Sequence, residues 1–471
     1  MTNLNRNHYD VVVIGAGMSG LAAAIRVGMY GKSVLLLERH TVAGGLNSYY
    51  KIGKYTFDVG LHAVTNYVEK GVKGTPLTKI FRQLRIDRDS FGLCPQTQSR
   101  ISFPETNLLF SNDFDQLRQS IADRFPNEVH NFDKFTVLAK TNKEYSKASA
   151  RGEIQSFFND PLLMEMLLCP LLYYGSATEN DMEFGQFLIL FNSIFLEGFA
   201  RPYEGIKPII NSLLKRAKEV GVERKMGLGV KKLGTESNRV AEIVLDNGSI
   251  VTADQILSSI GAPETQRLIH DSDRCRKSEE NIGKLAFIES IAVLDQPPLD
   301  LGFEDTIVFF NRSHQVKYER PNDLVDYRSG IICSPNHYDY GDRSLKENII
   351  RVTAQASEPM WRALSPEDYQ KQKQLAFDRL LETAASVTPN TSVEKLKTSV
   401  KFRDVFSPTT VTRFTGRIGG AIYGAPIKSS DGRTEIENLF ICGTDQGYLG
   451  IIGSMISGIA MANAHVLSAA S

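Results

Sequence analysis

The fold of this chain is decided by one stretch, Asp10-Val-Val-Val-Ile-Gly15-Ala-Gly17-Met-Ser-Gly20. An apolar, β-branched run ends at Gly15, and an Ala-rich apolar segment follows from position 21 to 29. This order predicts a buried strand, a tight glycine turn and a helix. The N–H groups and dipole at the start of such a helix suit a pyrophosphate. We therefore predict that Gly15, Gly17 and Gly20 bind a cofactor.

A second apolar run, residues 32–37, ends at Glu38. A carboxylate about 20 residues past the glycines accepts hydrogen bonds from ribose hydroxyls in dinucleotide-binding folds. Strand, turn, helix, strand and acid in this order predict an adenine dinucleotide site and an α/β fold with a Rossmann-type domain. The alternative is an ordinary glycine turn between two parallel strands.

Size and composition narrow the class of protein. A chain of 471 residues can form two or three domains, each with its own core. Lys plus Arg equals Asp plus Glu, 54 each, so a basic surface for nucleic acid is not indicated. The cysteines are odd in number, scattered and without a C-x-x-C pair, which predicts a reducing compartment, no disulfide framework and no metal site. They are Cys94, Cys169, Cys275, Cys333 and Cys442.

The sequence also bears on membranes and location. Polar residues precede the first strand and no secretory signal is visible, so we predict a cytoplasmic protein. Two apolar segments, 184–200 and 449–470, are interrupted by polar residues or diluted with Gly and Ser. A spanning helix needs about 20 mostly apolar residues, so both segments are predicted to be buried helices. Contact between the first segment and a bilayer surface is the alternative.

The order of patterns predicts a divided domain organisation. Residues 1–66, 203–265 and 405–471 are predicted to form one nucleotide-binding domain, which the insertions 67–202 and 266–404 interrupt. The middle segment has a helical pattern at 206–220 and two alternating strands, 240–245 and 250–257, joined by Asn247-Gly248, a strong hairpin signal. The third segment has a short strand at 439–442 before a helix of small residues.

The two insertions are predicted to form a mixed α+β substrate-binding domain. Residues 157–199 are rich in Leu, Phe and Met, which predicts a helical core, part of which could line an apolar substrate tunnel. Residues 366–384 and 392–401 are charged and amphipathic, which predicts solvated helices.

A second glycine motif follows Glu38 and reads Arg39-His-Thr-Val-Ala-Gly44-Gly45-Leu46, with Gly60-Leu-His62 shortly after. Two adjacent glycines just past the ribose acid let the backbone approach a cofactor closely. A plain NAD dehydrogenase has no need of this pair. The motif therefore favours FAD, bound along Arg39 to Leu46, with the isoalloxazine running past Gly60. Val230 is predicted to pack or hydrogen-bond at the adenine.

A third motif lies near the end of the chain, Gly443-Thr-Asp445-Gln-Gly-Tyr-Leu-Gly450-Ile451-Ile452-Gly453. A strand that ends in Gly-x-Asp predicts that the Asp445 carboxylate lies by the ribityl or pyrophosphate part of FAD. The following glycines predict that a helix beginning near Gly450, Ile451 and Ile452 lies under the flavin ring. The positive end of that helix would favour the negative charge of a reduced flavin.

With these three motifs in order, the chain resembles the two-dinucleotide-binding-domain flavoproteins, which include amine oxidases, carotenoid desaturases and Rab GDP-dissociation inhibitors. It is most similar to the phytoene desaturase family, with its carotenoid isomerases and retinol saturases. That resemblance is carried by Thr412, Gly416, Gly420, Tyr423-Gly424, Gly60-Leu-His62 and the third motif. Leu46 stands where amine oxidases and bacterial phytoene desaturases usually carry Arg, which weakens an amine oxidase interpretation.

The resemblance implies an FAD-dependent oxidoreductase that desaturates or saturates C–C or C=C bonds of an apolar isoprenoid or polyene, such as a carotenoid or retinoid. It places His62 near the flavin as a candidate for proton transfer, and Tyr423 as a possible hydrogen-bond donor there. Three alternatives stay open: a redox-neutral cis–trans isomerase of a polyene, an amine oxidase, and a non-catalytic isoprenoid-binding module.

Two further expectations concern partners. No second G-x-G-x-x-G follows, so no dedicated nicotinamide domain is predicted. Electrons would then pass to or from a partner protein, a quinone, oxygen or a transiently bound nicotinamide. Because polyenes dissolve in bilayers, we also expect peripheral attachment to a membrane surface.

Overall fold

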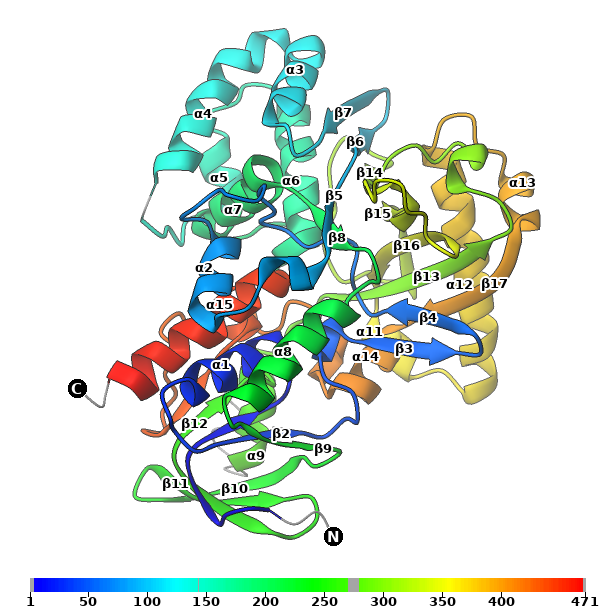
Figure 1. Ribbon diagram of the computed structural model, residues 1–471. Helices are drawn as coiled ribbons and strands as arrows, with labels where there is room; N and C mark the ends of the chain where they lie inside the picture. The colour runs from blue at the N-terminus through cyan, green and yellow to red at the C-terminus, as the bar shows by residue number, and fades with distance from the viewer. Residues whose placement is uncertain (1–3, 143, 270–278, 469–471) are drawn as a thin grey trace.

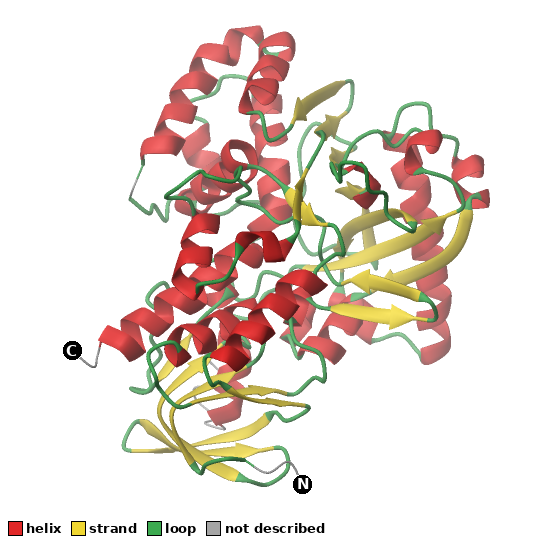
Figure 2. Cartoon of the chain, viewed as in Figure 1, coloured by secondary structure: helices red, strands yellow, loops and turns green. Residues whose placement is uncertain are grey.

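Two sheets and the helices that cover them make up the computed structural model, which describes residues 4–142, 144–269 and 279–468 (Figures 1 and 2). The first sheet has seven strands. Five are parallel, in the order β18-β12-β1-β2-β9, and an antiparallel pair, β10 (Val230–Glu236) and β11 (Arg239–Leu245), joins them through β12. The five parallel strands are β18 (Leu439–Ile441), β12 (Ile250–Ser258), β1 (His8–Ile14), β2 (Val34–Glu38) and β9 (Glu223–Met226). All three segments predicted to form the nucleotide-binding domain contribute strands to this sheet.

Both faces of β1, the central strand of the first sheet, are buried, as is usual for parallel sheets. Val11 and Val13 of β1 pack with the helices on one face, α1 (Met18–Gly28), α2 (Pro76–Leu84), α8 (Lys207–Glu219) and α15 (Gly450–Ala462). Val12 and Ile14 pack on the other face with β10 and β11. A strand covered on both sides reads as a continuous apolar run, which is the pattern at 11–14.

The hairpin predicted at Asn247-Gly248 is confirmed: β11 and β12 pair antiparallel, with Val244 opposite Ile250. The helix predicted at 206–220 is confirmed as α8, and the short buried strand at 439–442 as β18. α9 (Ala262–Ile269) follows β12.

α15 passes through the core, as the sequence predicted for the second apolar segment. Among the described residues, Gly450–Leu467 is the one helical stretch long and apolar enough to cross a membrane, with a mean hydropathy of 1.4. However, 61% of it is buried inside the protein. A Cβ atom at Gly458 would lie 2.0 Å from the carbonyl oxygen of Ser19, so α15 and α1 approach each other at backbone distance.

The second sheet has the order β17-β13-β16-β15-β14-β6-β7, with only β14 and β6 parallel. Its strands are β17 (Val400–Phe406), β13 (Ala286–Leu294), β16 (Asn348–Ala356), β15 (Val325–Cys333), β14 (Ile307–Asn311), β6 (Ser99–Phe103) and β7 (Thr106–Phe110). Both predicted insertions contribute to it. β17 extends past the predicted boundary at 404.

Helices cover both faces of the second sheet (Figure 1). α12 (Pro366–Val387), α11 (Glu358–Arg362) and α13 (Val393–Thr398) lie on one face. On the other face, a core of aromatic and aliphatic side chains joins the sheet to a helical group. That group contains α3 (Phe114–Arg124), α4 (Val129–Thr141), α5 (Ala150–Ile154), α6 (Pro161–Gly175) and α7 (Phe184–Phe191), which continues as a π-helical turn over Asn192–Glu197.

The second predicted amphipathic helix, 392–401, extends beyond the end of the observed helix. The observed helix ends at Thr398, and residues 400 and 401 belong to β17, where Val400 pairs with Leu294 of β13. Pairing with the neighbouring strand supplies backbone hydrogen bonds that the sequence pattern alone does not reveal. The remaining elements are short: β3 (Tyr49–Ile52), β4 (Tyr55–Asp58), β5 (Leu93–Pro95), β8 (Ala200–Pro202) and α14 (Pro408–Thr415).

Candidate functional site

A large cavity, referred to here as the outer cavity, opens at the carboxyl ends of β1 and β2. Its volume is about 880 Å³. Many of the residues predicted to bind the cofactor line it: Gly15, Gly17, Glu38, Arg39, Gly44, Gly45, Leu46 and Val230. The ligand crevice of an open α/β sheet lies at this edge of the strands.

The turn between β1 and α1 brings the backbone to the cavity wall. Gly15 has a φ of +94°, and a Cβ atom at Gly20 would lie 1.9 Å from the carbonyl oxygen of Gly15. The tight turn therefore needs glycine at both positions. Gly20 acts by letting the helix close on the turn, and it does not face the cavity as the sequence had suggested. A Cβ atom at Gly17 would meet nothing within 4 Å, because Gly17 borders the open cavity.

Glu38 and the second glycine pair fasten this turn. The Glu38 carboxylate accepts hydrogen bonds from the N–H groups of Ala16 and His40, both at 2.8 Å. The N–H of Gly44 donates to the carbonyl oxygen of Ala16 at 2.9 Å, and a Cβ atom at Gly45 would lie 3.6 Å from the Cα of Gly17. Gly44 has a φ of +116°. Two glycine segments therefore meet along one wall of the cavity.

A second hollow, the inner cavity, adjoins the outer one and has a volume of about 230 Å³. The two cavities share the wall residues Leu46, Asn47, Val59, Phe406, Thr444 and Ser454. Of the residues predicted from the sequence, Gly60, His62, Tyr423, Gly450 and Ile451 line it. The rest of the wall is mostly aromatic and aliphatic, including Tyr173, Tyr174, Leu190, Phe287, Ile331 and Ile422.

The N-terminus of α15 forms part of this inner wall. Leu449, Gly450, Ile451 and Gly453 all line the cavity, and the first turn has no acidic side chain. The unpaired N–H groups and positive dipole of the helix thus face the region where the two cavities join.

These features fit an adenine dinucleotide flavin. The open space at Gly17, beside the start of α1, suits the pyrophosphate, and Glu38 and Val230 border the part where ribose and adenine would lie. The connection into the inner cavity gives room for a longer group at the α15 N-terminus. Bound FAD would supply hydride transfer there.

Comparison with known proteins decides the family. The sequence pattern of the flavin-containing amine oxidoreductases matches residues 18–464. The chain belongs to this family. It is 24% identical over 455 residues to the chloroplastic prolycopene isomerase of Daucus carota, covering 88% of this chain and 72% of the relative. It is 23% identical over 459 residues to the 4,4'-diaponeurosporene oxygenase of Staphylococcus aureus, covering 88% and 87%.

A solved structure shows the same fold. An oxidoreductase from Methanosarcina mazei superposes with a TM-score of 0.65 at 18% identity, covering 98% of this chain and 99% of that one. The chain is thus a flavoprotein oxidoreductase with FAD as its cofactor and a Rossmann-type fold, as the sequence predicted.

His62 lies in a polar cluster at the inner cavity. Its Nε2 is 3.1 Å from Oγ1 of Thr353 and 3.5 Å from Oε2 of Glu289. Its carbonyl oxygen accepts hydrogen bonds from the hydroxyl of Tyr338, at 2.7 Å, and the thiol of Cys333. Glu289 also pairs with Arg351. The backbone and one ring nitrogen of His62 are thus fixed by the protein.

Sequence reasoning missed Glu289, Thr353 and Arg351. Glu289 is the one charged residue in β13, a mostly apolar strand whose nine residues are all buried. A single carboxylate in such a strand was the signal that could have revealed it, because buried charges need a partner. Arg351 and Thr353 alternate with apolar residues in β16 and gave no comparable signal.

Tyr423 lines the inner cavity, but its hydroxyl is already used. The Tyr423 hydroxyl donates to the carbonyl oxygen of Tyr173. A phenol carries a single O–H, so Tyr423 cannot also donate to a flavin in this conformation. Its predicted role as a donor is therefore replaced by a structural one, which joins the 417–428 segment to α6.

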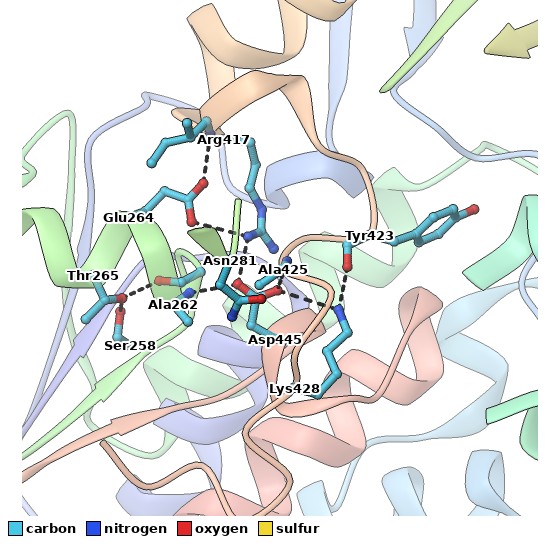
Figure 3. Close-up of polar contacts among 12 residues, drawn as sticks. Ser258, Ala262, Glu264, Thr265, Asn281, Arg417, Tyr423, Ala425, Lys428 and Asp445 are labelled. Carbon is cyan, nitrogen blue, oxygen red and sulfur yellow. Dashed lines mark hydrogen bonds and ion pairs between the residues drawn. The ribbon is translucent and has the colours of Figure 1, made fainter. Parts of the chain in front are cut away.

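Asp445 and Ile452 differ from their predicted roles. The buried Asp445 carboxylate accepts hydrogen bonds from the N–H groups of Ala262, at 2.7 Å, and Ala425, at 2.8 Å, and it pairs with Arg417 (Figure 3). With these partners it joins protein segments, and it lines neither cavity. Ile452 is fully buried in the same hydrophobic core as Ile451, but unlike Ile451 it does not line the inner cavity.

The charges around Asp445 form a buried network. Burial alone would raise the pKa of Asp445, but Arg417, Lys428 and the two N–H groups hold that pKa below its ordinary value. Burial raises the pKa of Glu264, which accepts a hydrogen bond from the N–H of Ile418 and pairs with Arg417. Lys428 donates to the carbonyl oxygen of Tyr423 at 2.6 Å (Figure 3).

The Lys428 ammonium makes stability depend on pH. Burial lowers the pKa of Lys428 from 10.5 to about 8. Between these values the unfolded chain holds a proton that the folded protein lacks, so stability rises with pH across this window. We expect the free energy of unfolding of the wild type, relative to Lys428→Met, to increase by about 1–3 kcal/mol from pH 8 to 10.5. Urea unfolding at a series of pH values measures this.

Lys371→Met is the matched control, because Lys371 lies on the exposed side of α12. Its stability relative to the wild type should stay constant over the same window. A constant difference for Lys428→Met as well would contradict the prediction.

The sequence also led to expectations about the cysteines and about a metal site. Cys94, Cys169, Cys333 and Cys442 are buried free thiols, and Cys275 lies outside the described residues. Within the described ranges, no group of three or more His, Cys, Asp or Glu residues is arranged to hold a metal ion.

Proposed function

We propose that the protein is an FAD-dependent oxidoreductase that desaturates or saturates carbon–carbon bonds of an apolar polyene of the carotenoid type. The observation that carries this proposal is the inner cavity, an aromatic and aliphatic pocket with an ionisable side chain, His62, at its wall. The two relatives support it, since their names describe action on carotenoids, prolycopene and 4,4'-diaponeurosporene.

Different residues of this chain would hold the cofactor, hold the substrate and transfer the proton. Gly17, Glu38 and the Gly44-Gly45 pair hold the nucleotide end of the cofactor. The apolar walls of the inner cavity exclude water and hold the polyene by burial of its surface. His62 gives or takes a proton at the reacting carbon. A conjugated chain spreads the charge that develops, so one such group can suffice.

A redox-neutral cis–trans isomerase is the second candidate. The similarity to a prolycopene isomerase over 88% of the chain favours it. Addition and removal of one proton at the same carbon would allow rotation about the neighbouring bond without net oxidation.

One anaerobic experiment tests both candidates. The purified holoprotein is mixed with cis-configured and partly saturated carotenoids, and flavin absorbance and product mass are followed together. Bleaching of oxidised flavin with a product two hydrogen atoms lighter supports desaturation. Reoxidation of prereduced flavin with a product two hydrogen atoms heavier supports saturation. Unchanged mass with altered geometry supports the isomerase. Reduction by amines and not by polyenes, or a protein that binds polyene without reaction, would overturn the proposal.

We also propose that the protein attaches peripherally to a membrane at the mouth of the inner cavity. Ile189 and Tyr448 line this cavity and are 39% and 37% exposed. Tyr145, which packs against Gly185 of α7, is 51% exposed. Ile427 is 74% exposed and precedes Lys428, which lies near Gly447 and donates to the carbonyl oxygen of Tyr423. These four exposed residues are called the rim here. Exposed apolar side chains gathered at the mouth of a cavity suit a bilayer that delivers an apolar substrate.

Flotation with phosphatidylcholine vesicles tests the rim. Ile427→Asp should weaken vesicle binding at least several-fold, because burying a charge in the bilayer opposes attachment. Ile250→Asp is the matched control, since Ile250 is 52% exposed but belongs to the β11–β12 hairpin and lines neither cavity. Equal binding of both variants, or no binding of the wild type, would contradict membrane attachment.

A further inference from the structure

Glu289 is a charged group in a wall that is otherwise mostly apolar and aromatic. It lies on β13 and accepts a hydrogen bond from Nε of Arg351 on the neighbouring strand β16. Its other oxygen, Oε2, is 3.5 Å from Nε2 of His62. Burial alone would raise the pKa of Glu289, but Arg351 and His62 lower it to about 2. The carboxylate is therefore ionised at any physiological pH.

The ionised carboxylate of Glu289 bears on which of the two ring nitrogens of His62 carries the hydrogen. Because a carboxylate can only accept hydrogen bonds, its oxygen 3.5 Å from Nε2 of His62 favours the tautomer that carries the hydrogen on Nε2. Oγ1 of Thr353, 3.1 Å from the same nitrogen, then also acts as an acceptor. Among the described residues Nδ1 of His62 has no hydrogen-bond partner, and the His62 side chain lines the inner cavity. Nδ1 is therefore the nitrogen available to a bound molecule.

We propose that Glu289 is a positioning residue that keeps the hydrogen on Nε2 of His62, so that Nδ1 exchanges a proton with a carbon atom of the substrate. This inference rests on the proposed function. In desaturation, one C–H bond gives a hydride to the flavin. The other gives its proton to Nδ1, and its electron pair becomes the new π bond. Saturation reverses these transfers. In isomerisation, Nδ1 adds a proton to one carbon and later takes one back.

The charged groups near His62 balance one another, and Glu289 is the negative charge nearest to its ring. Arg351 donates to the carbonyl oxygens of Asp58 and Leu61, and Arg201 pairs with Asp58. The two arginines thus balance the carboxylates of Glu289 and Asp58. Tyr338 and Cys333 contact only the backbone oxygen of His62. A proton on Nδ1 therefore adds one net positive charge, for which Glu289 is the nearest opposite charge.

The pH dependence of turnover tests the proposal. Glu289→Gln keeps the shape but removes the charge, and an amide can donate to or accept from Nε2. We expect the plateau rate of desaturation to fall at least about 10-fold, because part of the protein holds the wrong tautomer. The rising limb of the pH–rate profile should also move to lower pH, because the imidazolium loses its stabilising charge. Glu289→Asp, which restores the charge, should return the limb toward the wild-type position.

The control is Asp305→Asn. Asp305 is another buried carboxylate paired with an arginine, 2.8 Å from Arg100, but it lines neither cavity. Asp305→Asn should leave unchanged both the plateau rate of desaturation and the position of the rising limb of the pH–rate profile. A Glu289→Gln profile equal to that of the wild type would overturn the proposal.

A second readout separates this inference from the proposed function. Nitrogen-15 NMR of the eight ring-labelled histidines, with the His62 signals identified by their loss in His62→Phe, reports the tautomer without any substrate. A neutral His62 with hydrogen on Nε2 supports the inference even if no polyene reacts. Hydrogen on Nδ1 would overturn it even if the enzyme desaturates polyenes.

Discussion

We expect Gly17→Val to give a folded protein that purifies without flavin. Gly17 has φ −71° and ψ 179°, which valine adopts without strain, and a Cβ atom there meets open cavity. The added methyl groups would occupy the space beside the α1 N-terminus where the pyrophosphate binds. We expect the ratio of flavin to protein to fall at least about tenfold, equivalent to a penalty of about 1.4 kcal/mol or more. Visible absorbance and denaturing release of flavin measure the ratio.

Two further variants make this result interpretable. Gly152→Ala, in the short helix α5 where the nearest atom to the new Cβ is 3.5 Å away, should keep full flavin content. Gly20→Val should lose the fold itself, because its Cβ would lie 1.9 Å from a carbonyl oxygen. Wild-type flavin content in Gly17→Val would mean that the cofactor does not cross the α1 N-terminus.

His62→Phe retains flavin but loses turnover by ~10²–10⁴-fold, the usual contribution of a general acid or base. Phenylalanine fills nearly the same space, and the hydrogen bonds of Tyr338 and Cys333 to the His62 carbonyl oxygen are unaffected. Only the two ring nitrogens are lost. Single-turnover flavin reduction by a reactive polyene, compared with the flavin content of the same preparation, measures the effect.

The control is His465→Phe. His465 is also buried, and its Nε2 lies 2.6 Å from the carbonyl oxygen of Asp431, but it lies beyond α15 and lines neither cavity. Its variant should turn over at the wild-type rate. If His62→Phe is equally active, His62 is not the proton-transferring group.

The features that the sequence predicted best are those determined by residues close to one another in the chain. The Gly15–Gly20 turn, the strand that ends at Glu38 and the Asn247-Gly248 hairpin follow from local backbone geometry, which the residue types determine. The apolar pattern of β1 indicated a parallel sheet because both faces of that strand are covered.

Contacts between distant segments were not predictable in the same way. Thr353 is 291 residues from His62, and only the pairing of β13 with β16 brings Glu289, Arg351 and Thr353 together at the inner cavity. Asp445 matched a cofactor-binding pattern, yet Ala262 and Arg417, which come from elsewhere in the chain, surround its carboxylate. Ile451 and Ile452 are adjacent in sequence and both are buried in the same core, but of the two, Ile451 alone lines the inner cavity.

The carboxylate of Asp445 has a mechanical consequence. It fastens the end of the first sheet to the start of α9 and to the backbone at Ala425, two residues past the tyrosine that lines the inner cavity. The carboxyl end of the first sheet and the wall of the inner cavity are therefore held together by one buried carboxylate. For the polyene proposed as substrate, this wall would already be ordered before binding, which lowers the entropic cost of binding.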